Sequence, residues 1–148
     1  MYVTSLTLNN CAQATQLHRA CFYKGWTEKD FQDFLRDPLV FGLKIQKEDT
    51  FCGYILWREI DHEAEILTLV IAPPFQRKGL GNHLLKALLT YLKEKKISKL
   101  FLEVAEDNKA AQSFYLRNGF TLLGTRPKYY KRPENKFVDA LNFVRVIE

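Results

Sequence analysis

The stretch "IAPPFQRKGLGNHLLKALLTYLKEK", residues 71–95, decides the fold of this chain. It ends an apolar run, turns through Pro73 and Pro74, passes two glycines and continues with leucines at helical spacing. The prolines cannot donate to a sheet, so they end a strand. Gly79 and Gly81 stand where a helix begins, and the unpaired N–H groups and positive dipole end of a helix start attract anions. The stretch therefore predicts a strand, a phosphate-binding turn and a helix.

Two familiar phosphate motifs do not fit this stretch. A P-loop needs G-x-x-x-x-G-K-[ST], and the chain contains no such string. A dinucleotide fingerprint needs a third glycine where Leu84 stands, although an acidic residue, Glu103, follows about twenty residues on. The chain is also too short for paired nucleotide-binding halves. The motif that remains is Gln76-x-x-Gly79-x-Gly81.

The surrounding sequence predicts alternating strands and helices. Residues 40–46 and 51–60 alternate β-branched and aromatic residues around a polar turn, which is typical of a hairpin. The segment 63–72 is apolar on both sides towards its end, as in a central strand covered on both faces. Thr27 with Asp30 resembles a capping box. The full order is predicted to be β-α-α-β-β-β-α-β-α-β-β, an α/β fold with a right-handed β-α-β crossover in the middle.

Size and composition favour one soluble domain over residues 1–148. The chain is 47% hydrophobic and 26% charged, as in ordinary globular proteins. It has neither a basic leader before an apolar stretch nor an apolar run of the roughly 20 residues that a membrane helix needs. Its three cysteines are irregularly spaced and fit a reducing cytoplasm. No ligand spacing links the histidines with one another or with the cysteines, so no metal site is expected.

The net charge of +5 predicts an attraction for anions, among them nucleotide phosphates, RNA and acidic proteins. The run "RPKYYKR", residues 126–132, interleaves aromatic and basic side chains, a pattern that also suits stacking on single-stranded RNA. Charge by itself does not choose among these partners.

Several motifs together resemble the GNAT family of N-acetyltransferases. Gln76-x-x-Gly79-x-Gly81 resembles the family's acetyl-CoA pyrophosphate loop, [QR]-x-x-G-x-[GA]. "LEVAEDNKAAQSFYLRNGF", residues 102–120, is similar to its second half, in which an Asn opens a helix and a Tyr follows two turns later. "GWTEKDF" and "KYYKRPENKFVDAL" resemble the branch that acetylates the N-terminal alanine of small-subunit ribosomal protein eighteen. This resemblance implies a mixed sheet of six to seven strands with about four helices, and acetyl-CoA as co-substrate.

The resemblance also implies roles for individual residues. Glu103 is implied to be the general base and Tyr115 the general acid, with Asn108 both a helix cap and a coenzyme contact. From the residues alone, Glu103 can instead lie at a solvent-facing rim, and Tyr115 can be a core aromatic between Phe114 and Leu116. The implied acetyl-CoA contacts are the backbone of Val70, Ile71 and Ala72, the loop Gln76, Arg77, Lys78, Gly79, Leu80 and Gly81, and also Asn108 and Tyr115.

The resemblance implies four contacts with the substrate that accepts the acetyl group: Trp26, Tyr129, Tyr130 and Asp139. Trp26 can equally serve the core. Gly25 departs from the family pattern, which usually shows proline there, and this leaves the conformation of that loop open. The implied partner is a protein or peptide N-terminus, such as that of a ribosomal protein. The alternatives are an acetyltransferase that acts on another terminus, a lysine or a small amine, and a non-catalytic module that binds acyl-CoA or RNA. No membrane and no direct nucleic-acid partner is expected.

Overall fold

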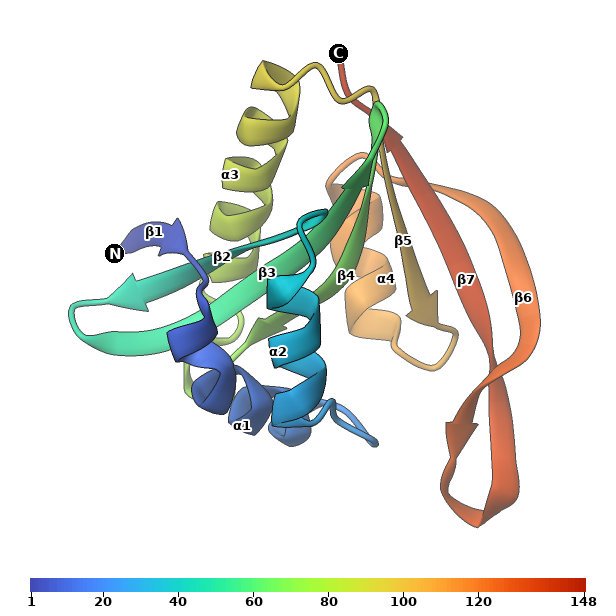
Figure 1. Cartoon of the computed structure of the whole chain (residues 1–148). Helices are drawn as coiled ribbons and strands as arrows, with labels where there is room; N and C mark the ends of the chain where they lie inside the picture. Colours follow the sequence, from blue (N-terminus) through green and yellow to red (C-terminus); the bar gives the residue numbers. More distant parts are fainter.

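A single mixed sheet of seven strands organises the molecule, in the spatial order β1-β2-β3-β4-β5-β7-β6 (Figure 1). The computed structural model describes residues 1–148. The strands are β1 (Tyr2–Ser5), β2 (Val40–Lys47), β3 (Thr50–Ile60), β4 (Glu63–Ile71), β5 (Lys99–Ala105), β6 (Thr121–Arg132) and β7 (Lys136–Val146). The helices are α1 (Cys11–Cys21), α2 (Glu28–Arg36), α3 (Leu80–Glu94) and α4 (Lys109–Arg117), with short 3-10 turns η1 (Leu8–Asn10), η2 (Pro73–Phe75) and η3 (Pro133–Asn135). This order confirms the predicted one.

The helices cover both faces of the sheet. On one face, α1 and α2 enclose a cluster that includes Phe31 and Tyr54. On the other face, α3 and α4 enclose the larger cluster. Four leucines of α3 are fully buried there: Leu84, Leu85, Leu88 and Leu92. Burying a leucine side chain contributes roughly 1.5–3 kcal/mol, so the helical spacing of these leucines fixes α3 against the sheet.

The chain crosses from β4 to β5 through α3, and these two strands separate after a short parallel pairing. Only Glu63–Glu65 of β4 pair with Lys99–Phe101 of β5. Beyond that point the two strands diverge towards their C-terminal ends, as Figure 1 shows. We call this region, bordered by residues 66–71 of β4 and 102–105 of β5, the split. Its backbone edges carry no strand-to-strand hydrogen bonds.

Local sequence signals account for the helix ends. Thr27 and Asp30 form the predicted capping box: the Thr27 Oγ1 accepts from the Asp30 N–H at 3.1 Å, and the Asp30 Oδ2 accepts from the Thr27 N–H at 2.8 Å. Asn108 caps α4 by accepting from the Ala111 N–H at 3.2 Å, and Gly119 follows α4 at φ +84°. None of the helices has the length and apolar character needed to cross a membrane.

Candidate active site

The N-terminus of α3 lies at the C-terminal end of β4 and is left open by the chain. Its cap residue is Gly79, which offers no side chain, and the first turn contains no acidic residue. The N–H groups of Leu80, Gly81 and Asn82 have no acceptor within the chain. Unpaired N–H groups and the positive end of the helix dipole therefore point out of the helix together. This arrangement suits a phosphate or diphosphate.

The turn before α3 is shaped by the sequence predicted to hold phosphate. Arg77 and Gly79 have left-handed backbone angles, with φ +63° and +84°. The Gln76 Nε2 donates to the Ile71 carbonyl at 2.9 Å, so this side chain ties the turn to the end of β4. Lys78 is exposed, as is Arg77, and both are free to approach an anion. Leu80 is buried at 3% exposure, so only its backbone can take part in binding.

The strand register corrects the backbone contacts predicted at the end of β4. The Ala72 N–H donates to the Cys52 carbonyl of β3 at 2.8 Å. Backbone groups alternate in direction along an antiparallel pair, so Val70 also faces β3. The alternate residues Leu69 and Ile71 face the split instead. Of the three predicted residues, only Ile71 has its backbone groups on this side: its carbonyl already accepts from the Gln76 Nε2, and its N–H faces the split, as do the backbone groups of Leu69.

Glu103 and Tyr115 lie on opposite faces of the sheet beside the split. In β5, Leu102 and Val104 point into the cluster beneath α3 and α4, which also contains Tyr115. Side chains alternate along a strand, so Glu103 points to the other face. The fold therefore places a carboxylate and a phenol on either side of the same region of the sheet.

Tyr115 is enclosed almost completely, at 5% exposure. Its ring packs edge-on against Phe114 and Phe120, at centroid distances of 5.1 and 5.3 Å. Burial raises the pKa of Tyr115 well above its ordinary value. The phenol consequently keeps its proton at neutral pH, which a general acid requires. The two sequence interpretations, core aromatic and proton donor, are compatible at this position.

Glu103 is half-buried and has two neighbours from β6. The Arg126 Nη2 lies 3.4 Å from the Glu103 Oε2, and the Glu103 side chain is 21% exposed. Tyr130 is close enough for its charge to be coupled to that of Glu103: burial, followed by the Glu103 carboxylate, raises the pKa of Tyr130 to about 12. The fold thus brings Glu103, the predicted base, close to Tyr130, one of the residues predicted to contact the substrate.

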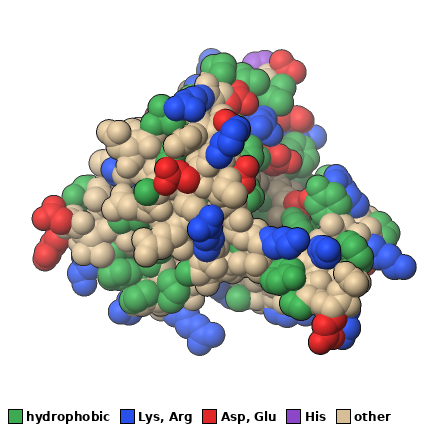
Figure 2. All heavy atoms as spheres, turned by 60° about the horizontal axis from the view of Figure 1, so that its bottom comes forward, with side chains coloured by type: hydrophobic (Ala, Val, Ile, Leu, Met, Phe, Trp, Pro, Cys, Tyr) green, Lys and Arg blue, Asp and Glu red, His purple; other side chains and the backbone are tan.

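The β6–β7 hairpin, which projects from the molecule, carries two more of the predicted acceptor residues, Tyr129 and Asp139. Its register slips between Arg126 and Tyr130, and the Asp139 Oδ1 accepts from the Lys128 N–H at 2.9 Å within this bulge. Asp139 therefore shapes the bulge that presents Tyr129, which is 49% exposed. Figure 2 shows lysine and arginine side chains spread over the whole visible face, among acidic and hydrophobic ones, rather than gathered on one side.

The loop into α2 carries Trp26, which is half-buried rather than open. Its ring stacks on His18 at 4.7 Å and packs on Phe34 at 4.7 Å. Gly25 is required by close approach, because a Cβ there would lie 2.8 Å from the Arg19 Cα. The ring of a proline brings such a Cβ, so this loop cannot take the conformation seen here with the usual family residue.

One further residue at the split was not predicted from the sequence. The Thr68 Oγ1 is the single buried side-chain polar atom without a hydrogen-bond partner. It lies in the part of β4 that β5 does not pair with. Buried polar groups are nearly always paired, so this enclosed hydroxyl is an exception beside the split.

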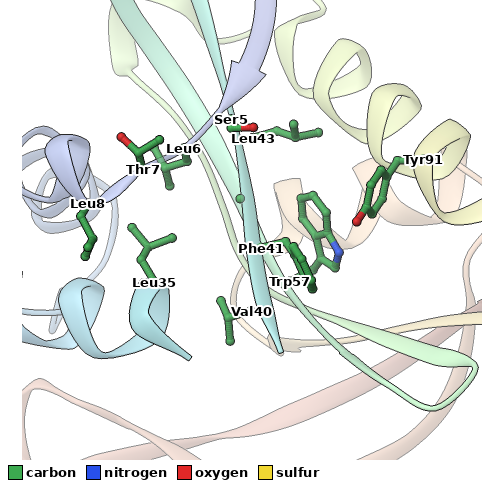
Figure 3. A pocket seen from close by; sticks show the side chains of 11 residues that line it. Ser5, Leu6, Thr7, Leu8, Leu35, Val40, Phe41, Leu43, Trp57 and Tyr91 are labelled. Atoms are coloured by element: carbon green, nitrogen blue, oxygen red, sulfur yellow. The ribbon is translucent and has the colours of Figure 1, made fainter. Parts of the chain in front are cut away.

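A separate apolar hollow of about 250 Å³ lies at the other end of the sheet. Figure 3 shows its lining, with Leu8 and Leu35 on one side of β2 and Phe41, Trp57 and Tyr91 on the other. Its lining includes the hydroxyl groups of Ser5, Thr7 and Tyr91 but no carboxylate, histidine, cysteine, lysine or arginine, and none of the site residues predicted from the sequence. The split, rather than this hollow, is the candidate active site.

Comparison with known proteins gives consistent results. The model of the acetyltransferase (GNAT) family matches residues 11–120. The [ribosomal protein bS18]-alanine N-acetyltransferase of Haemophilus ducreyi is 32% identical over 100 residues, which are 68% of this chain and 69% of that protein. The enzyme of the same name from Salmonella typhimurium is 28% identical over 128 residues, 86% of each chain. The crystal structure of the corresponding Escherichia coli enzyme superposes with a TM-score of 0.93 at 24% identity, covering 99% of this chain and 94% of that one.

Proposed function

The chain belongs to the GNAT family and is an N-acetyltransferase, as its sequence predicted, and on that premise we propose that it acetylates a protein N-terminus with acetyl-CoA. The proposed acceptor is the N-terminal alanine of ribosomal protein bS18, the substrate named for both relatives. A ribosomal-protein substrate would place the reaction in the cytoplasm. The observation that carries the proposal is the split, with Glu103 on one face, Tyr115 on the other and the open start of α3 at its end.

The start of α3 fits the diphosphate of acetyl-CoA. Three unpaired N–H groups and an uncapped helix end supply a site for two negative phosphates. The backbone groups of Leu69 and the N–H of Ile71 form a strand edge for the amide-containing arm, as an added strand would use. The Asn108 Oδ1 is engaged in capping α4, which leaves its amide N–H₂ for a contact with the coenzyme.

Glu103 and Tyr115 would divide the two proton transfers. As the acceptor nitrogen bonds to the acyl carbon, Glu103 takes the proton that the nitrogen loses, directly or through water. As the carbon–sulfur bond breaks, Tyr115 gives its phenolic proton to the departing sulfur. The buried phenol is protonated at neutral pH, and the half-buried carboxylate can reach the acceptor side.

An α-amino group is the less costly acceptor. Its reference pKa is near 8 against about 10.4 for lysine, so deprotonation at pH 7 costs about 1 kcal/mol rather than about 5 kcal/mol. A single weak carboxylate base is sufficient for the first and poorly matched to the second. The energetics therefore favour a terminal amine over a lysine or a polyamine.

The test is mass spectrometry of peptides after incubation with acetyl-CoA and the purified chain. We expect one acetyl group on the α-nitrogen of a peptide beginning Ala-Arg-Tyr, and none on its N-blocked form or on an internal lysine. Glu103→Gln should lower kcat by roughly 10²–10⁴-fold, a typical contribution of a positioned base. Glu106→Gln, an exposed carboxylate just beyond β5, is the matched control and should retain activity. Preferential acetylation of lysine or of polyamines would overturn the proposed acceptor.

A further inference from the structure

The β6–β7 hairpin carries two arginine–carboxylate pairs that differ in construction. Arg132 grips Asp107 with two short hydrogen bonds, from Nε at 2.8 Å and from Nη2 at 2.7 Å. Arg126 meets Glu103 through one longer contact of 3.4 Å. A forked pair holds one geometry firmly, whereas a single long contact between half-exposed groups contributes little. The Arg132–Asp107 pair is therefore the stable one, whereas the Arg126–Glu103 pair can separate easily.

Arg126 also contacts a second side chain, that of Tyr129. Its guanidinium carbon lies 4.4 Å from the centroid of the Tyr129 ring, within the range of a cation–π interaction. The bulge that Asp139 holds through the Lys128 N–H fixes the backbone beside Tyr129. The Arg126 side chain is 55% exposed, so it can leave Glu103 while remaining over the ring.

The other groups near Glu103 do not replace this cation. Arg132 is committed to Asp107, and the Tyr130 phenol is neutral because burial and the nearby Glu103 raise its pKa to about 12. Asp139, which accepts from the Lys128 N–H, adds a second negative group to the same hairpin. Glu103 therefore has one cationic partner within 4 Å, and that partner is Arg126.

We propose that Arg126 is a placeholder counter-ion, which the Glu103 carboxylate exchanges for the ammonium group of the incoming acceptor. The inference rests on the proposed function, because it takes Glu103 as the group that receives the acceptor's amine. An N-terminus arrives largely as an ammonium ion at neutral pH. A guanidinium beside Glu103 repels that ion until it moves away from the carboxylate, a movement during which it can keep its contact with the Tyr129 ring. Arg126 thus lowers the affinity for the acceptor and keeps the carboxylate paired between turnovers.

The consequence is unusual for an arginine beside an active site, since its removal should strengthen acceptor binding. In Arg126→Gln, the ammonium no longer competes for Glu103. The gain should be roughly two- to fivefold in Kd, the size expected for one partly exposed ion pair. Arg126→Lys keeps a cation near Glu103 and should behave more like the parent chain. Lys131→Gln removes the same charge from an exposed position on the same hairpin and should leave Kd unchanged.

Isothermal titration calorimetry of the coenzyme A-saturated chain measures this directly, because no chemistry follows binding. The probes are a synthetic peptide beginning Ala-Arg-Tyr and the same peptide with an acetylated N-terminus. We expect Arg126→Gln to bind the free peptide more tightly and the blocked peptide, which has no ammonium, no differently from the parent chain. Unchanged or weaker binding of the free peptide by Arg126→Gln would overturn the inference while leaving the proposed function intact. If the parent chain neither binds nor acetylates the free peptide, the proposed acceptor is wrong and the inference falls with it.

Discussion

The helices α2 and α3 begin in opposite ways. Around the start of α2, side chains satisfy three backbone N–H donors: His18 accepts from Trp26, Asp30 from Thr27, and Thr27 from Asp30. Two acidic residues, Glu28 and Asp30, stand in its first turn. The start of α3 has no capping side chain and no acid, and two cations, Arg77 and Lys78, precede it.

The difference separates stability from binding. Caps and first-turn acids each stabilise a helix by about 0.3–2 kcal/mol, and α2 uses both. The start of α3 lacks this stabilisation and has unpaired N–H groups, which the proposed function assigns to the diphosphate of the coenzyme. A change at α2 should therefore alter the stability of the fold and not coenzyme binding, whereas a change at α3 should alter coenzyme binding.

The largest expected effect is a loss of folding stability at low pH, and it arises on the α2 side. His18 is 4% exposed, and burial, opposed by Asp30, lowers its pKa from 6.5 to about 4. Because the folded pKa lies below the unfolded one, the neutral ring stabilises the fold fully above about pH 6.5, and this contribution is lost as the pH falls towards 4. At about 1.4 kcal/mol per pKa unit, it amounts to at most about 3 kcal/mol.

Urea unfolding at several pH values measures the effect. His18→Gln should lose that part of the pH dependence, whereas substitution of the exposed His62 should preserve it. Equal slopes for the parent chain and His18→Gln between pH 6.5 and 4 would show that the buried ring is not responsible.

The starts of α2, α3 and α4 could be predicted from the sequence, because the residues that cap a helix act on nearby backbone groups. Thr27, Asp30 and Asn108 act on backbone groups within three residues, and Gly79 sets its own φ. The order of strands and helices followed from periodicity, since the leucines of α3 meet the core at their own spacing.

The contacts across strands could not be predicted in the same way. The choice of Leu69 and Ile71 over Val70 and Ala72 depends on the register of β4 against β3, which contains an irregularity between Leu56 and Trp57. No local residue pattern marks that irregularity, and a shift of one residue reverses which groups face the split. The approach of Arg126 to Glu103 likewise depends on pairing between distant strands.

An acidic residue in the first turn of α3 should make its N-terminus resemble that of α2. Asn82→Asp adds a carboxylate to the first turn of α3 and can still accept from the Asn118 Nδ2, which lies 3.0 Å from the Asn82 Oδ1. The free chain should become more stable by a few tenths to about 1 kcal/mol. Coenzyme A should bind about tenfold more weakly, because the new charge occupies the positive end that the diphosphate would use.

Calorimetry with coenzyme A and thermal unfolding test both effects. Asn135→Asp, which adds the same charge at an exposed position in η3, is the control and should change neither. Undiminished coenzyme binding by Asn82→Asp would mean that the diphosphate does not lie at the start of α3.

Removing the α2 cap should have the complementary result. Thr27→Ala deprives the Asp30 N–H of its acceptor and should lower the free energy of unfolding by about 1 kcal/mol. Thr27→Ser keeps the hydroxyl and should recover most of that loss. The affinity for coenzyme A, measured by the same titration, should not move for either variant, and a change would show that the two helix starts are coupled.

The smallest expected effect is that of a cation before α3. Lys78 is exposed, so its attraction for a bound diphosphate is screened by solvent and salt. Lys78→Gln should weaken coenzyme A binding about twofold at moderate ionic strength, by a few tenths of a kcal/mol. The deficit should grow at low salt and vanish at high salt, because the Debye length shrinks from roughly 30 Å at 0.01 M to about 3 Å at 1 M. Lys86→Gln, an exposed position further along α3, removes an equal charge away from the open N–H groups and should show no such dependence. If both variants respond alike to salt, the net charge of the chain, rather than a cation placed at this helix start, attracts the coenzyme.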